Sequence, residues 1–139
     1  MKNYPFSLDS KKILITGASS GIGRAVAIET SKLGATVILC ARNEERLAET
    51  ISSCHPNEDN RYICADLSKQ DEIEYMIGKL PEKIDGVVHC AGVSRIAPIM
   101  FTDRKKNREV FDINFFSWCE ITRLLIKKRI IKKGGSLVS

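Results

Sequence analysis

Residues that mark metal centres and disulfide frameworks are scarce in this sequence of 139 residues. There are only two histidines, His55 and His89, and they stand far apart with no metal-ligand spacing. The five cysteines are irregularly spaced, and no two of them form a Cys-x-x-Cys pair. This pattern indicates neither a zinc site nor a disulfide framework, and the odd number favours reduced thiols buried as small apolar groups. We therefore expect no bound metal.

Long apolar runs are also missing. No stretch approaches the roughly 20 residues that span a bilayer, and the segment Met1–Phe6 lacks the apolar core of a secretory signal. By default, these absences predict a cytoplasmic protein with no membrane partner. The composition, with 43% hydrophobic and 28% charged residues, is typical of one ordinary globular domain.

The net charge of +5 raises the question of a nucleic-acid partner. The basic residues gather late in the chain, in the runs 104–106, 127–129 and 132–133. Such runs are usually solvated faces or ends of helices, where lysines also suit the helix dipole. No nucleic-acid-binding motif accompanies them, so we expect no nucleic-acid partner. A nucleic-acid binder would instead show a steep salt dependence for DNA binding.

Apolar runs that suit buried strands alternate with segments that suit helices. Strands are expected at residues 13–16, 35–40, 62–65, 84–89 and 136–139, and helices at 24–33, 43–51, 71–80 and 103–133 with a break near 112–114. Asn43 is expected to cap the second helix, Ser68 and Asp71 to form a capping box before the third, and Gly134-Gly135 to turn into the last strand. The alternation predicts an α/β fold with a parallel sheet of strand order 3-2-1-4-5 and a ligand crevice beside strand one.

The segment Ile13–Gly23 combines a short buried strand, a glycine-rich turn and the start of a helix, with its glycines spaced G-x-x-x-G-x-G. Gly17 lets the chain leave the strand at a φ that a Cβ would resist. Gly21 lets the backbone approach a ligand, and Gly23 lets the new helix pack tightly on the strand. The helix N-terminus favours an anion such as a pyrophosphate. Hydroxyl donors surround the same place, on Thr16, Ser19 and Ser20.

The octapeptide Thr16–Gly23, TGASSGIG, resembles the cofactor fingerprint of the short-chain dehydrogenases/reductases, NAD(P)-dependent oxidoreductases on a Rossmann-type fold. The resemblance runs from about Lys11 to the last residue. It implies that residues 1–139 form a doubly wound Rossmann-type domain, C-terminally incomplete and truncated at strand five. It also implies a small-molecule carbonyl or alcohol substrate and a homo-oligomer in the complete protein. The cofactor contacts that it implies in the turn are Thr16, Gly17, Ser19, Ser20, Gly21, Ile22 and Gly23.

The residues after strand two bear on the choice of dinucleotide. An acid there would bind the ribose 2′-OH of NAD, whereas an arginine accommodates the 2′-phosphate of NADP. The sequence has Arg42 and no acid before Glu44, which favours NADP over NAD, unless Arg42 is merely a surface arginine. The family's other common basic position, inside the glycine turn, holds Ser19 here.

Further positions match the family after strands three and four. Asp66-Leu67 resembles its adenine contact, and a turn aspartate before a helix is compatible with that role. The segment that ends in Cys90, Ala91 and Gly92 begins with His89 and stands where the family usually has Asn-Asn-Ala-Gly. Ala91 and Gly92 keep a small surface beside the cofactor ribose. Cys90 is interpreted as a structural thiol, since nothing near it in sequence would lower its pKa.

Asn114 matches the helix asparagine that the family uses to hold a proton-relay water; the alternative is a helix cap or kink, since asparagine is disfavoured inside helices. Carbonyl reduction also needs an acid that the cofactor cannot supply. The resemblance implies a serine just after strand five and a Tyr-x-x-x-Lys pair on the next helix, and neither is present. The pair Tyr75 and Lys79 has this spacing but falls on the third predicted helix, about 10 Å from the strand ends, and is rejected as catalytic.

Two hypotheses follow. The first is the cofactor-binding portion of a short-chain dehydrogenase/reductase, inactive as the 139-residue chain, with Asn114 as the one catalytic-tetrad residue present. The second is a non-catalytic dinucleotide-binding module or a truncated gene product. NADPH binding without turnover of any ketone or alcohol would support the second, and activity restored by a C-terminal extension would contradict it.

Overall fold

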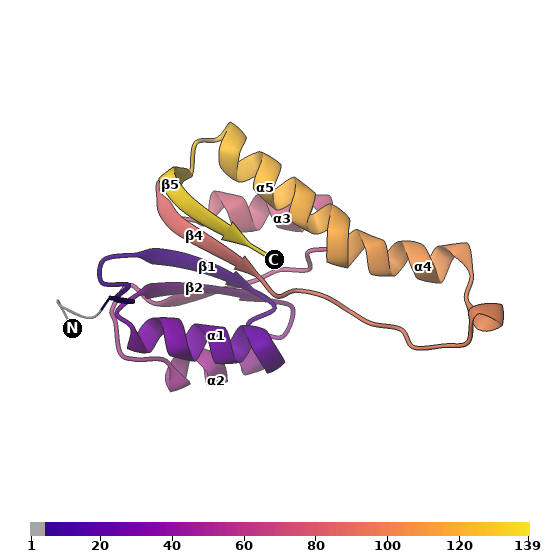
Figure 1. The fold of residues 1–139 in the computed structure, drawn as a ribbon, viewed down its shortest axis with the longest axis horizontal. Helices are drawn as coiled ribbons and strands as arrows, with labels where there is room; N and C mark the ends of the chain where they lie inside the picture. Colours follow the sequence, from indigo (N-terminus) through magenta and orange to yellow (C-terminus); the bar gives the residue numbers. More distant parts are fainter. Residues whose placement is uncertain (1–4) are drawn as a thin grey trace.

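Residues 5–139 are described by the computed structural model, which shows one parallel sheet between two layers of helices (Figure 1). The strands are β1 (Lys12–Thr16), β2 (Thr36–Ala41), β3 (Arg61–Cys64), β4 (Ile84–His89) and β5 (Ile131–Val138). The α-helices are α1 (Gly21–Lys32), α2 (Glu44–Ser53), α3 (Gln70–Gly78), α4 (Arg104–Phe111) and α5 (Ser117–Lys127). A 3-10 turn, η1 (Ile99–Phe101), and a π-turn, η2 (Asp112–Phe116), complete the elements.

All strand pairs of the sheet are parallel, and the order is β3-β2-β1-β4-β5, which confirms the predicted topology. The central strand β1 pairs with β2 on one side and β4 on the other, so that Thr16 stands opposite both Cys40 and His89. The carboxyl ends of these strands therefore lie at one edge of the sheet. A ligand crevice is expected at such an edge, where the chain order reverses.

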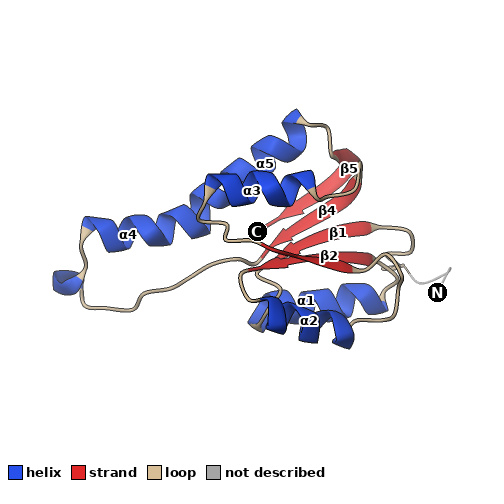
Figure 2. Ribbon diagram, turned by 180° about the vertical axis from the view of Figure 1, so that it is seen from behind, coloured by secondary structure: helices blue, strands red, loops and turns tan. Residues whose placement is uncertain are grey.

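Alternate residues of β1 enter two separate cores because successive strand side chains point to opposite faces. Ile13 and Ile15 belong to the core under α1 and α2, whereas Leu14 belongs to the core under α3 and α5. Figure 2 shows the same division, with one pair of helices on each face of the sheet. Both faces of β1 and β2 are covered, which explains why these strands read as continuous apolar runs.

The predicted start of the last strand was wrong. Helix α5 ends at Lys127, and β5 already begins at Ile131, so the chain turns at Arg129 rather than at the glycine pair. Arg129 adopts a positive φ of 55° there. Gly134 and Gly135 lie within β5, where the pairing with β4 shifts register. A Cβ on Gly135 would lie 2.9 Å from the Asp85 carbonyl oxygen, so this irregularity needs a glycine.

One of the two predicted helix caps is confirmed and the other is wrong. The side chain of Asn43 accepts a hydrogen bond from the backbone N–H of Arg46 (2.9 Å) and caps α2. Helix α3 starts one residue later than the capping box would need, with Lys69 at its N-cap position and no side-chain cap. The Ser68 hydroxyl donates instead to the carboxylate of Asp66 (2.8 Å), which removes it from the helix end.

Residues 93–103 form an arm that runs out from the sheet edge and returns into α4 (Figure 1). An ion pair between Arg95 and Glu109 (2.6 Å) joins the arm to α4. The predicted helix break near 112–114 is the π-turn η2, through which the helical ribbon continues from α4 into α5. The arm and α4 thus extend beyond the carboxyl end of the sheet, whereas α5 packs on it (Figure 1).

The two predicted caps yield a matched stability test. Asn43→Ala should lower the free energy of unfolding by about 1 kcal/mol because the Arg46 N–H loses its acceptor. Asn43→Asp should keep most of the stability. Ser68→Ala should change it by less than about 0.5 kcal/mol, since this residue caps no helix. Urea denaturation followed by circular dichroism measures all three, and equal losses at both sites would contradict the capping assignment.

Candidate functional site

A cleft of about 690 Å³ opens at the carboxyl ends of β1 to β4. Its wall comes from the β1–α1 turn, from the segments that follow β2 and β3, and from the segment that follows β4. Every predicted cofactor contact except Thr16 lines this cleft: Gly17, Ser19, Ser20, Gly21, Ile22, Gly23, Arg42, Asp66, Leu67, Cys90, Ala91 and Gly92. The fold thus gathers into one cavity residues that are spread over about half of the chain.

The β1–α1 turn is held by close backbone contacts at two of its glycines. Gly17 has a φ of +66°, and a Cβ there would lie 2.6 Å from the carbonyl carbon of Cys90 at the end of β4. A Cβ on Gly23 would overlap the carbonyl oxygen of Gly17. Gly21 is different, because its φ is +53° but no atom lies within 4 Å of the Cβ position. The space beside Gly21 opens to the cleft, where a ligand could approach the backbone.

The first turn of α1 points its amide groups at this space. Ser20 occupies the N-cap position with no side-chain cap, and the first turn contains no acidic residue. The N–H groups at a helix start lack partners within the helix, and they combine with the positive end of the helix dipole. The cradle is therefore suited to an anion of the size of a phosphate group.

Thr16 does not reach the cleft. It is fully buried, and its hydroxyl oxygen lies 2.8 Å from Nδ1 of His89 and accepts a hydrogen bond from the backbone N–H of Ala91 (3.1 Å). Its hydroxyl is therefore not a free donor for a ligand. Its hydrogen bond with the Ala91 N–H instead holds in place, from the buried side, a residue that lines the cleft.

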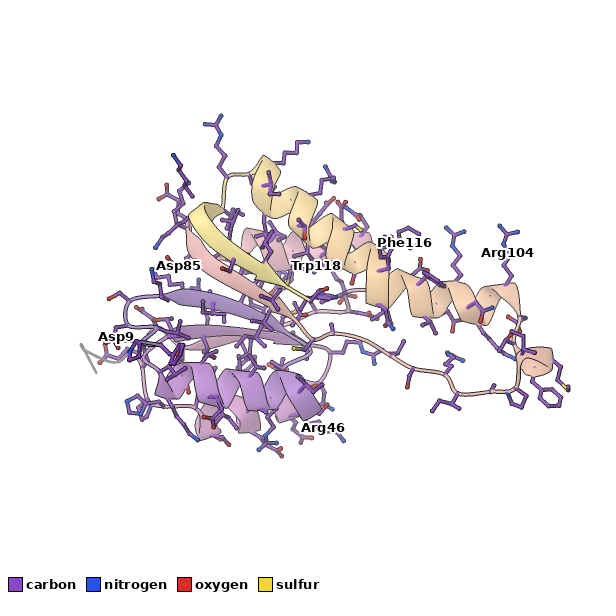
Figure 3. All side chains as sticks on the ribbon, viewed as in Figure 1. Asp9, Arg46, Asp85, Arg104, Phe116 and Trp118 are labelled. Carbon is purple, nitrogen blue, oxygen red and sulfur yellow. The ribbon has the colours of Figure 1, made fainter. Side chains whose placement is uncertain are left out.

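Two arginines that follow β2 line the cleft. Arg42 lines the cleft as predicted, and Arg46, from the first turn of α2, lines it too. Among residues 5–139 neither guanidinium forms an ion pair, so both are free to meet an anion. Arg46 was not predicted from the sequence, although it stands only four residues after Arg42. Figure 3 shows Arg46 near the end of the sheet from which the arm departs, and Asp85 toward the opposite end of the sheet.

Asp66 presents a carboxylate to the cleft after β3. Partial burial acts to raise its pKa, but hydrogen bonds from the Ser68 N–H and hydroxyl, together with the charges of Arg42 and Lys69, hold the pKa below its usual value. The group is therefore ionised at neutral pH and can only accept hydrogen bonds. An exocyclic amine of a nucleobase is a suitable donor for it.

Cys90 forms part of the wall after β4 together with Ala91 and Gly92. Burial raises the pKa of the Cys90 thiol, so the group is protonated at neutral pH. A protonated thiol is a poor nucleophile. The side chain therefore contributes bulk to the wall rather than covalent chemistry.

Asn114 lies in the π-turn η2 and does not line the main cleft. Its amide forms a reciprocal pair with the backbone of Val93, accepting from the N–H and donating to the carbonyl, both at 2.8 Å. The pair joins the helix to the base of the arm. Both polar atoms of the side chain are thus engaged, and Asn114 lines a second, mainly apolar cavity of about 640 Å³ between the arm and α4.

Tyr75 lies on α3 and Lys79 is the C-cap residue of that helix, and both are outside the cleft lining. The tyrosine is exposed, and the Lys79 ammonium stands 5.4 Å from the centre of its ring. The arrangement is a surface cation–π contact.

Within residues 5–139, no group of three or more histidine, cysteine, aspartate or glutamate side chains is arranged to hold a metal ion. In the same range, every helix is too short or too polar to cross a bilayer.

Comparison with known proteins identifies the family. The family model for short chain dehydrogenases matches residues 11–139, and the chain belongs to this family of oxidoreductases. It is 33% identical to 3-ketodihydrosphingosine reductase gsl-3 of Neurospora crassa, over 97% of this chain and 40% of that protein. It is 31% identical to the NADPH-dependent pterin aldehyde reductase of Arabidopsis thaliana, over 94% of this chain and 55% of that protein.

A solved structure shares the fold. The crystal structure of a short chain dehydrogenase from Escherichia coli CFT073 complexed with NADPH superposes with a TM-score of 0.79 at 29% identity. The match covers 88% of this chain and 54% of that one. The chain thus spans about half the length, or less, of these relatives.

The close approach of Gly23 to Gly17 yields a prediction with an internal control. Gly23→Ala should lower the free energy of unfolding by about 1–3 kcal/mol, because the new methyl group overlaps the Gly17 carbonyl. Gly78→Ala, at a helical position with nothing within 4 Å, should be neutral or stabilising by up to about 1 kcal/mol. Thermal unfolding of both variants tests this, and a tolerated Gly23→Ala would contradict the observed packing.

Proposed function

We propose that residues 11–139 form the cofactor-binding part of a short-chain dehydrogenase/reductase that uses NADP to reduce a carbonyl group or oxidise an alcohol. The observation that carries the proposal is the single cleft that combines an anion cradle at the start of α1, two free guanidinium groups and a carboxylate. Bound there, the nicotinamide would supply a hydride to a carbonyl or accept one from an alcohol. The NADPH complex of the similar Escherichia coli protein supports this choice of cofactor.

Each part of the cleft suits one part of the dinucleotide. The open backbone beside Gly21 and the uncapped start of α1 would hold the pyrophosphate. The Asp66 carboxylate would accept from the adenine amine, and the small residues Ala91 and Gly92 would lie beside the nicotinamide ribose.

The preference for NADP follows from charge. A 2′-phosphate adds about two negative charges at the ribose, and Arg42 and Arg46 line the cleft after β2 without ion-pair partners there. No acid occupies residues 40–43 to accept from a 2′-hydroxyl, as NAD would require.

Within residues 5–139 the cleft wall holds no hydroxyl acid suited to protonating a substrate carbonyl, since Tyr75 lies outside it. We propose that the 139 residues alone bind the cofactor without turnover. The five free thiols support the expected cytoplasmic location. The homo-oligomer and the small-molecule carbonyl or alcohol substrate remain expectations from the family.

Arg42→Ala should weaken NADP⁺ binding by roughly 10- to 100-fold, the loss expected when a charge-assisted contact to a phosphate is removed. NAD⁺, which lacks the 2′-phosphate, should bind within about threefold of the parent protein. Isothermal titration calorimetry measures both. Arg61→Ala, an exposed arginine at the start of β3, is the matched control and should change neither affinity. Equal losses for NAD⁺ and NADP⁺ would contradict the phosphate role of Arg42.

The 139-residue chain should bind NADPH, and a mixture with a panel of aldehydes and ketones should consume none of it above the rate without protein. Fluorescence enhancement of NADPH reports binding, and its absorbance reports turnover. Binding with no turnover agrees with the proposal. Protein-dependent NADPH oxidation would show that an acid is present after all, and absence of binding would contradict the cofactor assignment.

A further inference from the structure

His89 is a buried polar residue at the end of β4 that the cofactor contacts described above do not use. Only 7% of its surface is exposed, and it stands where the resembled family usually has an asparagine. In the sheet it lies directly opposite Thr16 of β1. A neutral imidazole has one donor and one acceptor nitrogen, and a buried ring that became charged would add the cost of an unpaired buried charge.

Thr16 connects His89 to the wall of the cleft. The threonine oxygen accepts the N–H of Ala91 (3.1 Å), and its own proton then needs an acceptor. The acceptor within reach is Nδ1 of His89, at 2.8 Å. We assign the ring proton to Nε2, because only this tautomer lets the hydroxyl both accept from Ala91 and donate to His89. The chain of contacts runs from the imidazole to the edge of the cleft.

On its other side, His89 is fixed by α5. Its ring stacks on Trp118 with the ring centres 5.1 Å apart and an angle of 22° between the planes. Figure 3 shows Trp118 between α5 and the sheet. Within residues 5–139, Nε2 is buried without a hydrogen bond of normal geometry. Ile113, which lines the cleft, has its backbone close to this ring.

We propose that His89 is a positioning residue that holds the Ala91 edge of the cofactor cleft through Thr16, and that it does so only while its ring is neutral. This inference rests on the proposed cofactor role of the cleft. A second proton, on Nδ1, would turn the ring into a donor at both nitrogens. The Thr16 hydroxyl proton would then lose its acceptor in a fully buried place, and a charge would be buried next to Trp118.

The titratable groups on the surrounding elements do not favour the charged ring. Cys40, opposite Thr16 on β2, is a neutral thiol whose pKa is raised by burial to about 12. Asp112 precedes Ile113 in η2, and Glu120 on α5 is paired with Arg123. The acids of α3, which packs on α5, are Asp71, Glu72 and Glu74. None of them contributes to the pKa of His89, which burial lowers and the Ile113 backbone offsets only in part.

The direction of the pH dependence follows from this environment. Because the pKa of His89 is lower in the folded protein than in the unfolded chain, the unfolded chain takes up the proton first. Stability is therefore complete above about pH 6.5 and is lost as the pH falls from there toward the folded pKa. The hydrogen bond from the Ala91 N–H to the Thr16 hydroxyl, and with it the affinity for the cofactor, should weaken over the same pH range.

Trp118 is the only tryptophan in the sequence and reports on its stacked neighbour directly. Its fluorescence should show a quenching step as the pH falls below about 6.5 in the parent protein, because an imidazolium stacked on the indole quenches its emission. His89→Asn should remove the step, whereas His55→Asn, at the only other histidine, should keep it. This readout needs no cofactor, so it tests the His89 assignment separately from the proposed function.

The second measurement is NADP⁺ affinity between about pH 5 and pH 8. Thr16→Val should weaken binding at neutral pH by about tenfold, and Thr16→Ser, which keeps the hydroxyl, should restore it. His89→Asn should also weaken binding at neutral pH, because the Thr16 hydroxyl loses its imidazole acceptor, but it should lose less further affinity in acid than the parent protein. Circular dichroism confirms that each variant is folded. The 2′-phosphate of NADP⁺ also titrates in this pH range, but it affects the affinities of the parent protein and of the variants equally. The difference in acid loss of affinity between them therefore reports on His89.

The outcomes separate the possibilities. A fluorescence step in His89→Asn, or equal acid losses of NADP⁺ affinity in His89→Asn and in the parent, would overturn the inference. Affinity unchanged in Thr16→Val would overturn it as well. Absence of NADP⁺ binding by the parent at every pH would refute the proposed function, while the fluorescence step would still decide whether the His89 ring titrates as described.

Discussion

Backbone contact at the carboxyl end of β1 is the constraint on which the rest of the site depends. Gly17 lies against the carbonyl of Cys90, and Gly23 lies against the carbonyl of Gly17, at distances that leave no room for a Cβ. The end of β4, the turn after β1 and the first turn of α1 meet there only because the side chains are absent. The same contacts orient the first amide groups of α1 toward the cleft and position the backbone surface that a bound ligand would contact.

Charge is distributed along the cleft in a way that matches its shape. The uncapped helix start supplies partial positive charge at the centre, and the guanidinium groups of Arg42 and Arg46 supply full positive charge at one end. Asp66 remains ionised because Ser68 donates two hydrogen bonds to it. An elongated ligand with a central diphosphate, a base with a free amine and a further anionic group complements all of these features together.

Much of the fold could be predicted from the sequence because its strands carry continuous apolar runs and its helices begin at recognisable positions. The strand order and the Asn43 cap are examples. The start of β5 was misplaced because Gly134-Gly135 signals a turn, whereas the structure uses these glycines at a register shift inside a strand. The Ser68 cap failed because Asp66, two residues earlier, competes for the same hydroxyl.

Within the site, the residues of local motifs were predictable and the contacts between strands were not. Nothing in the sequence near Thr16 indicates that its hydroxyl meets His89, which is 73 residues away. Asn114 was chosen by its match to a family position, but its reciprocal pairing with Val93 depends on the geometry of the arm. Such side chains reveal their partners only once parallel strands and helices have been brought together.

The most direct test of the account is to follow the backbone amide signals of the 139-residue chain by NMR while NADPH is added. We predict that the large shift changes fall at Ser19–Gly23 and at Arg42, Asp66, Ala91 and Gly92, with little change at the opposite end of the sheet near Asp85. Changes concentrated elsewhere, or no saturable change at all, would contradict the assignment of the cleft as the dinucleotide site.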